Sequence, residues 1–317
     1  MIGPALDVGT DLTTDLVQPF QLELSNVRGR AVRLGAVLDD VLGRHDYPHV
    51  VEQIVAEAIA ATVLLASLLK YEGVFTLQAK GDGPLSLMVV DVTTSGDVRA
   101  YARFDAERLP DASVADIPAL FGAGYLAFTV DQGEKSEGYQ GIVALEGTSL
   151  ADCLSHYFVQ SEQLLTDARM AARLYPDGWR AGGLLIQHLP DEDAGRVVKT
   201  PGEDEEDWRR ATILMNTVAE VELLDRTLHL NGLLFRLFHE EQVRVFPPHA
   251  IQRGCRCSAE RVGQVLSSIP REEIEDLKVD GEIVVTCEFC GTAYVSEDGL
   301  DFEERKLNTK DTKITKV

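Results

Sequence analysis

Residues 50–69 read VVEQIVAEAIAATVLLASLL, and the predicted architecture is built around them. The run is long enough for a helix of several turns, and apolar side chains such as Ile54 and Leu64 occur on nearly every side of it. Because Glu52 and Glu57 interrupt the run, we interpret it as part of a soluble protein and not as a membrane span. A helix without a polar face belongs inside a core, so we expect sheet on more than one side of it. The alternative is a helix that binds a partner.

Strand and helix patterns surround this run. Alternating apolar and polar residues predict strands, and apolar residues at intervals of three and four predict helices. The predicted strands lie in residues 16–25, 27–34, 73–104 (with turns at 81–84 and 94–97), 125–131 and 139–146, and the predicted helices are residues 35–43 and 150–165. We therefore expect an α+β fold, with a mixed sheet-and-helix core over residues 1–190 and a buried central helix.

Beyond the core the composition changes. Residues 191–207 hold eight carboxylates against Arg196 and Lys199, which indicates a solvated, mobile linker. Two amphipathic helices follow, and their apolar faces need a surface to lie on. The first covers residues 208–225, with Leu214, Val218 and Val221 on one face, and the second covers residues 228–238, where we favour helix over a hairpin at Asn231-Gly232. The predicted units are an acidic and helical linker at 191–250, a zinc-binding domain at 251–300 and a frayed tail at 301–317.

The charge balance restricts the partners. The 317 residues include 30 Lys and Arg against 52 Asp and Glu, a net charge of −22. Such an acidic chain is a poor ligand for the phosphates of nucleic acid and for anionic membrane surfaces, so we expect neither partner. The first 14 residues contain no basic cluster followed by an apolar run, and we expect a cytoplasmic protein.

The spacing of four cysteines indicates a metal-binding site. Cys255 and Cys257 are followed, after 29 intervening residues, by Cys287 and Cys290. Two close pairs with this separation are typical of one tetrahedral zinc site with four thiolate ligands. Around them we expect strands at 282–285 and 293–295, a positive φ at Gly291, a helix at 259–266 capped by Ser258, and a helical turn at 272–277. So small a module depends on its metal, which contributes about 10 kcal/mol or more in structural zinc sites.

Two features suggest that this site does more than stabilise a fold. The first pair is Cys-X-Cys instead of the Cys-X-X-Cys of most zinc ribbons, and a disulfide between Cys255 and Cys257 would be strained and readily reduced. Cysteines three apart across a tight turn bridge more easily, so each pair offers reversible oxidation. Four thiolates on a divalent cation also leave a charge of about −2. Arg253, Arg256 and Arg261 lie close in sequence and can balance it, which keeps the sulfurs available to peroxide or hypochlorous acid. Oxidation would then remove the metal and unfold the module.

The chain resembles the heat-shock protein 33 family of redox-regulated holdase chaperones. The resemblance rests on the cysteine pattern and on further matches in the family's order: RGRAVRL at 28–34, YFVQSEQ at 157–163, AGGLLIQ at 181–187, RLFHEE at 236–241 and CEFC at 287–290. The acidic residues 203–207 and the lysine-containing tail after residue 306 depart from the family pattern.

The resemblance implies a mechanism. The reduced, zinc-bound form would be a largely inactive monomer. Oxidation would form the disulfides Cys255–Cys257 and Cys287–Cys290, release Zn²⁺, unfold the linker and produce an active, dimeric holdase. Its partners would be unfolding client proteins, and ATP would not be required.

Other constellations support no enzyme activity. Cys153 and His156 share a helical face, but a buried thiol beside an incidental histidine is far commoner than a catalytic pair, and we assign Cys153 no function. The zinc-protease, deaminase and phosphate-loop signatures are absent from the sequence. The competing hypothesis is a binding factor with a constitutive structural zinc ribbon.

Overall fold

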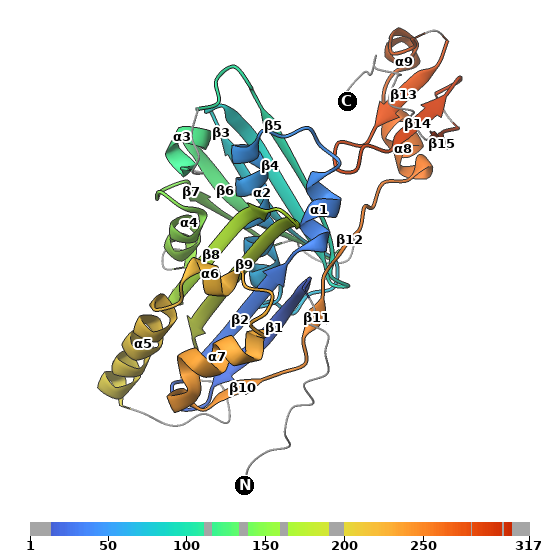
Figure 1. Ribbon diagram of the computed structural model, residues 1–317. Helices are drawn as coiled ribbons and strands as arrows, with labels where there is room; N and C mark the ends of the chain where they lie inside the picture. Colours follow the sequence, from blue (N-terminus) through green and yellow to red (C-terminus); the bar gives the residue numbers. More distant parts are fainter. Residues whose placement is uncertain are drawn as a thin grey trace.

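The computed structural model describes residues 14–110, 116–132, 139–158, 164–189, 200–279, 281–299 and 301–305. Its elements in chain order are drawn in Figure 1: β1 (Leu16–Leu22), β2 (Val27–Leu34), α1 (Ala36–Leu42), α2 (His49–Ala66), β3 (Val74–Gly81), β4 (Leu85–Thr93), β5 (Asp97–Phe104), α3 (Ile117–Phe121), β6 (Gly124–Asp131), β7 (Tyr139–Ala144), α4 (Leu150–Tyr157), β8 (Thr166–Tyr175), β9 (Gly178–His188), α5 (Pro201–Asn216), α6 (Glu220–Leu223), α7 (Leu230–Phe238), η2 (His239–Glu241), β10 (Val243–Val245), β11 (His249–Ala250), β12 (Gln252–Arg253), α8 (Ala259–Leu266), α9 (Arg271–Asp276), β13 (Ile283–Thr286), β14 (Ala293–Ser296) and β15 (Glu303–Arg305).

The central helix α2 lies between two sheets. One sheet has the strand order β10-β1-β2-β9-β8, with β11 also paired to β1, and the other has the order β12-β5-β4-β3-β6-β7. α2 contacts β2, β8 and β9 of the first sheet and β3, β4 and β5 of the second. The helix is long and apolar enough to cross a membrane, but 78% of that span is buried inside the protein. The prediction of an α+β core around a buried helix is confirmed.

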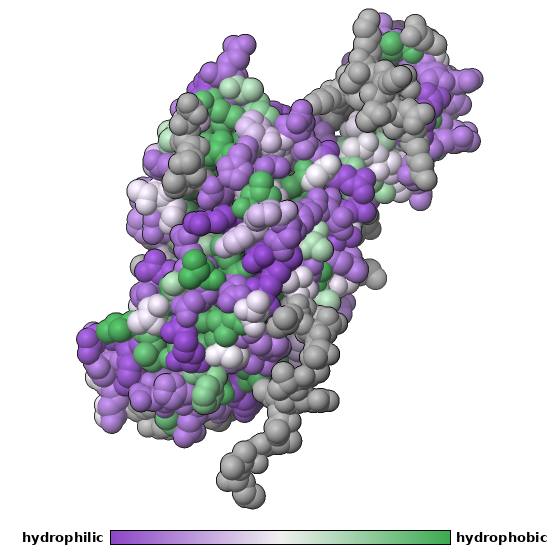
Figure 2. All heavy atoms as spheres, in the orientation of Figure 1, coloured by the Kyte–Doolittle hydropathy of each residue, from purple (hydrophilic) through white to green (hydrophobic). Residues whose placement is uncertain are grey.

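The helices α5, α6 and α7 cover the other face of the first sheet. Leu234 and Phe238 of α7 are fully buried in an apolar cluster there, and Phe238 stacks on Phe20 of β1 with ring centroids 5.7 Å apart. Gly182 of β9 permits the close approach of α6, because a Cβ at this position would lie 2.4 Å from the carbonyl oxygen of Leu223. Figure 2 shows mostly hydrophilic residues over this region, with hydrophobic ones in small, separate patches.

The hairpin of β8 and β9 was not predicted from the sequence. The helix predicted for residues 150–165 ends at Tyr157 in α4, and residues 159–163 lie outside the described part of the chain. Leu165 is not helical, because its carbonyl oxygen accepts a hydrogen bond from the backbone of His188 at 2.9 Å and leads into β8. The two-residue turn Pro176-Asp177, followed by Gly178 at the start of β9, is a sequence signal that could have identified the two strands.

The prediction of a solvated linker through residue 207 is wrong from Pro201 onward, where α5 begins. Thr200 and Glu203 form a capping interaction, since the Thr200 backbone N–H donates to Glu203 Oε2 at 3.0 Å, and proline is favoured at the first helical position. Asp207 is buried and pairs with Arg210 at 2.8 Å. Residues 191–199 lie outside the described part.

The helix predicted for residues 208–225 is interrupted. α5 ends at Asn216, where the Thr217 hydroxyl donates to the carbonyl oxygen of Leu214 at 2.7 Å. α6 begins after Ala219, whose backbone N–H donates to the Glu222 carboxylate at 2.9 Å. The break turns Val221 outward with 64% of its surface exposed, so its predicted place on the apolar face is wrong. The helix predicted over residues 228–238 is confirmed as α7.

The chain returns to the core before it enters the C-terminal module. β10 and β11 pair with β1, and β12 pairs in parallel with β5. The module itself contains α8, α9 and the sheet β13-β14-β15 around a small apolar cluster, and it projects from one end of the core (Figure 1). The frayed tail was predicted to begin at residue 301, but β15 pairs with β14 over residues 303–305, so this start is wrong. Residues from 306 onward lie outside the described part.

Candidate metal centre

The first cysteine pair is held at the edge of the core sheet. β12 ends at Arg253, and the backbone N–H of Gly254 donates to the carbonyl oxygen of Val98 in β5 at 3.0 Å. After Cys257 the chain enters α8, whose N-terminus is capped as predicted: the Ser258 hydroxyl accepts from the backbone N–H of Arg261 at 3.2 Å. The pair therefore lies between a core strand and a helix start.

The second pair occupies the turn between β13 and β14. The backbone N–H of Cys287 donates to the carbonyl oxygen of Thr292 at 2.9 Å, and that of Gly291 donates to Cys287 at 2.8 Å. Gly291 has a φ of 71°, and β14 returns beside β13. These features confirm the two strands and the positive φ predicted around the second pair, and the predicted helical turn at 272–277 is found as α9.

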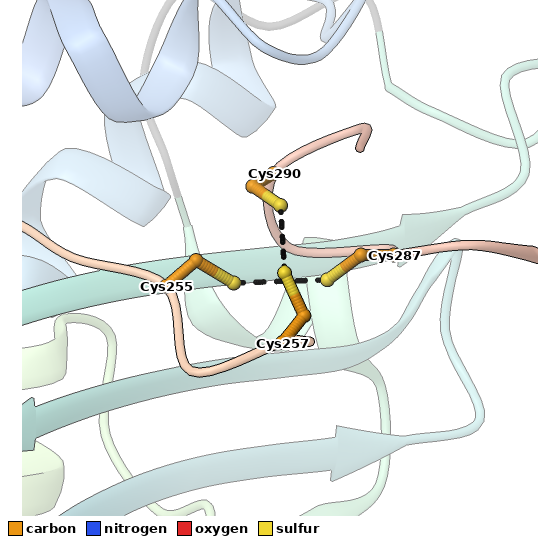
Figure 3. A group of neighbouring side chains, drawn as sticks. All are labelled: Cys255, Cys257, Cys287 and Cys290. Carbon is orange, nitrogen blue, oxygen red and sulfur yellow. Dashed lines mark hydrogen bonds between the residues drawn. The ribbon is translucent and has the colours of Figure 1, made fainter. Parts of the chain in front are cut away.

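The fold brings all four predicted cysteine sulfurs together, as Figure 3 shows. The Sγ atoms lie within 4.8 Å of one another, with 3.7 Å between Cys255 and Cys287 and 3.4 Å between Cys257 and Cys290. A tetrahedron of sulfurs about 2.3 Å from a zinc ion has edges of roughly 3.8 Å. The donor set and the distances between its sulfurs therefore fit a tetrathiolate metal site. These distances exceed the S–S bond length of a disulfide, about 2.05 Å.

Burial and hydrogen bonds among the cysteines shift the pKa values of their thiols in different directions. The neighbouring thiol of Cys287, followed by that of Cys290, holds the pKa of Cys255 well below its ordinary value. Burial raises the pKa of Cys257 to about 11, although the Tyr294 hydroxyl donates to its sulfur at 3.2 Å. A cation at the centre would favour the ionised form of all four thiols, because thiolates are its ligands.

The cationic side chain that contacts a sulfur comes from the core sheet. Arg99 Nη1 of β5 donates to Cys255 Sγ at 3.8 Å, and its guanidinium lies over the ring of Phe289 at 3.9 Å. Of the arginines predicted to balance the cluster, Arg256 instead pairs with Asp91 at 2.7 Å, and Arg261 donates to the carbonyl oxygen of Arg256. Arg99 gave no sequence signal, because it lies 156 residues before Cys255.

Cys153 lies apart from the cluster. It belongs to α4 and is fully buried in the core, and burial raises the pKa of its thiol to about 11. His156 faces Glu146 instead, with 3.6 Å between Nδ1 and Oε2. The structure gives no support to a thiol–imidazole pair.

Comparisons with known proteins agree over most of the chain. The family model described as Hsp33 protein matches residues 15–297. The 33 kDa chaperonin of Caulobacter vibrioides is 42% identical over 294 residues, which cover 90% of this chain and 95% of that protein. The 33 kDa chaperonin of Escherichia coli O7:K1 is 37% identical over 295 residues, covering 93% and 96%. The crystal structure of the 33 kDa chaperonin from Thermotoga maritima has a TM-score of 0.78 at 24% identity, covers 91% of this chain and 97% of its own, and indicates the same fold.

Proposed function

The chain belongs to the Hsp33 family of chaperones, and from this premise we propose that it is a redox-regulated, ATP-independent holdase that binds unfolding proteins and prevents their aggregation under oxidative and heat stress. The observation that carries the proposal is the gathering of four cysteine sulfurs within 4.8 Å, at the junction between the core and a small C-terminal module. The chain path from the helices α5–α7 to this cluster supports a link between its redox state and the rest of the molecule.

In the reduced state, Cys255, Cys257, Cys287 and Cys290 would hold one Zn²⁺. When bound, the ion supplies folding free energy and keeps the four sulfurs ionised. The module needs such support because its apolar cluster is small, with Leu266, Ile274, Ile283, Tyr294 and Phe302 as its buried members.

Oxidation would convert the cysteines of each pair into a disulfide, Cys255–Cys257 and Cys287–Cys290. Each bond forms from two thiolates with the loss of two electrons, and one hydrogen peroxide molecule accepts these electrons with two protons and becomes two water molecules. The sulfur–sulfur hydrogen bonds of Cys255 with Cys287 and of Cys257 with Cys290 join the two pairs, and forming a bond within each pair would break them, so the module must rearrange as the disulfides form. Disulfide sulfurs no longer bind the cation, and the module then loses the interaction that folded it.

Loss of the module would loosen the linker helices. β10, β11 and β12 are only two or three residues long, and they connect α7 to the first cysteine pair. Once these short strands detach, α7 is held mainly by its apolar face against the first sheet. Release of α5–α7 would expose the cluster that contains Phe20, Leu184 and Ile186 on the sheet and Leu233 and Phe238 on α7. Exposed apolar surface on a body with a net charge of −22 can hold client chains in solution.

The remaining properties follow from the same proposal. The protein would be a monomer when reduced and a homodimer when oxidised, it would act in the cytoplasm, and it would have neither enzyme activity nor nucleic-acid or membrane partners. The high acidic charge supports the last two exclusions, because it repels phosphate backbones and anionic headgroups.

One titration tests the function. The reduced, zinc-loaded protein is treated with increasing peroxide at elevated temperature, zinc release is followed with a chromogenic chelator, and suppression of the aggregation of a heat-denatured client is measured by light scattering. We expect zinc release and holdase activity to rise together, with peptide mapping identifying the two disulfides. A constitutive zinc ribbon would release no zinc at oxidant levels that leave the fold intact and would gain no activity.

A further inference from the structure

The cysteine cluster is attached to the core through Arg99. Besides its contacts with Cys255 and Phe289, the Arg99 guanidinium donates twice to Asp91 Oδ2, from Nε at 2.8 Å and from Nη2 at 2.7 Å. One planar group therefore contacts a ligand of the first cysteine pair, a ring between the ligands of the second pair, and a carboxylate of β4. A planar guanidinium, unlike the ammonium of lysine, can donate hydrogen bonds in its plane and stack face-on at the same time.

Asp91 of β4 holds this guanidinium in place. Asp91 is buried, with 4% of the residue's surface exposed, and its Oδ1 accepts a hydrogen bond from the Thr76 hydroxyl at 2.6 Å. Oδ2 also accepts from Arg256 Nη2 at 2.7 Å, and Arg256 lies between the two cysteines of the first pair. Two arginines around one carboxylate leave a net positive charge beside four sulfurs that carry the opposite sign.

The second pair contacts the same strand at a neighbouring position. The Tyr101 hydroxyl donates to Glu288 Oε1 at 2.9 Å, and the rings of Tyr101 and Phe289 lie 6.2 Å apart. Arg103 lies farther along β5, is mostly exposed, and is 3.8 Å from Glu288. Residues 99, 101 and 103 thus present one face of β5 to the module, and of these Arg99 alone contacts a sulfur in the described structure.

We propose that Arg99 is a positioning residue of the metal centre: anchored by Asp91, it holds Cys255 and Phe289 in the arrangement that binds the cation and so ties the redox state of the cysteines to the docking of the module on β5. The inference rests on the proposed function and adds to it the core residue through which the cluster is coupled. It also explains the site's location, since the cysteines assemble where the module meets the sheet.

The test compares Arg99→Gln, Arg99→Lys and the control Arg103→Gln as reduced, full-length proteins loaded with Zn²⁺ or Co²⁺. Loss of one charge-assisted hydrogen bond to the cluster should speed zinc transfer to a chelator about tenfold in Arg99→Gln. The rate of zinc transfer in Arg99→Lys should lie between those of this variant and wild type. Lysine keeps the charge but lacks the planar guanidinium that stacks on a ring and donates two hydrogen bonds. Arg103→Gln should match wild type, since exposed ion pairs contribute little.

Two further readouts separate positioning from general stability. The sulfur-to-cobalt charge-transfer absorption should shift in Arg99→Gln and not in Arg103→Gln, and amide exchange should quicken in β12 while α2 stays protected. Wild-type zinc transfer, an unchanged cobalt spectrum and unchanged β12 exchange in Arg99→Gln would overturn the inference while leaving the proposed function intact. If Arg99→Gln does not fold, Arg99→Lys decides, because zinc transfer at the wild-type rate would refute the role of the guanidinium plane. A wild-type protein that retains no zinc would instead refute the proposed function, and β12 exchange would still report whether Arg99 docks the module.

Discussion

Replacing Phe238 by alanine tests whether the linker helices hold the chaperone inactive. Phe238 has no exposed surface and stacks on Phe20. Truncating a buried phenylalanine costs about 3–5 kcal/mol, from lost apolar burial and the cavity that remains. If this cost falls on the docked state of α7, the ratio of released to docked helix rises by roughly a hundredfold to several thousandfold. We therefore expect holdase activity in the reduced protein, without any change at the cysteines.

The assay is suppression of client aggregation under reducing conditions, with bound zinc measured in the same sample. Phe235→Ala is a matched control, because Phe235 lies in the same helix with 64% of its surface exposed. The control should remain inactive until it is oxidised. Hydrogen exchange should show lost protection in α7 of Phe238→Ala and retained protection in α2. If α7 exchanges rapidly in Phe238→Ala while the reduced protein still ignores the client, release of this helix is not the activating step.

Three other changes address the metal, the linker and pH. Cys287→Ser should abolish zinc retention because it leaves three thiolates, whereas the control Cys153→Ser should retain one zinc per chain. A full zinc complement in Cys287→Ser, measured by metal analysis, would contradict the ligand assignment. Arg33→Gln removes hydrogen-bond donors to the carbonyl oxygens of residues 222, 223 and 228. We therefore expect α6 and the start of α7 to lose amide protection and the basal holdase activity to rise. Unchanged hydrogen exchange would show that these bonds do not hold the linker. Burial raises the pKa of Glu57 to about 7, above its value in the unfolded chain. The stability that this carboxyl contributes is therefore fully present below the unfolded pKa and is lost as pH rises through about 7. Glu57→Gln should therefore raise Tm relative to wild type at about pH 8 and converge with it near pH 4, and an equal Tm difference at both pH values would count against this sign.

Local patterns were sufficient for much of the fold. The run at 50–69 has no polar face, and such a helix can only be buried, which is how α2 is found. The Ser258 cap and the turn at Gly291 depend on neighbours within a few residues, so their chemistry is visible in the chain itself. The cysteine spacing likewise predicted the four sulfurs that the structure brings together.

The errors arose where a local signal was misread or where a tertiary contact decided the outcome. Thr200, Pro201 and Glu203 form a helix start, but the surrounding carboxylates led to the prediction of a solvated linker. The helix predicted through residue 165 does not include Leu165, because this residue pairs with His188 of a strand whose presence had not been predicted. Periodicity describes which side chains can share a face, whereas strand pairing depends on residues far away in the chain.

The Arg99–Asp91 pair that holds the metal centre on the core is a tertiary contact, which local sequence patterns do not predict. The charges of this pair explain how the module can undock from the core. Asp91 is buried, and a buried carboxylate without a partner is strongly destabilising. On the proposed mechanism, Arg256 departs with the cysteines, but Arg99 belongs to β5 and stays paired with Asp91 at 2.7 Å. The core therefore keeps a neutral ion pair when the module is released, and the positive charge that is removed is that of Arg256, the second cationic partner of Asp91. Because no buried charge is stranded on the core, undocking costs the contacts that the module makes with β4 and β5, including the ion pair of Arg256 with Asp91. The reduced module can then dock again on the retained Arg99–Asp91 pair.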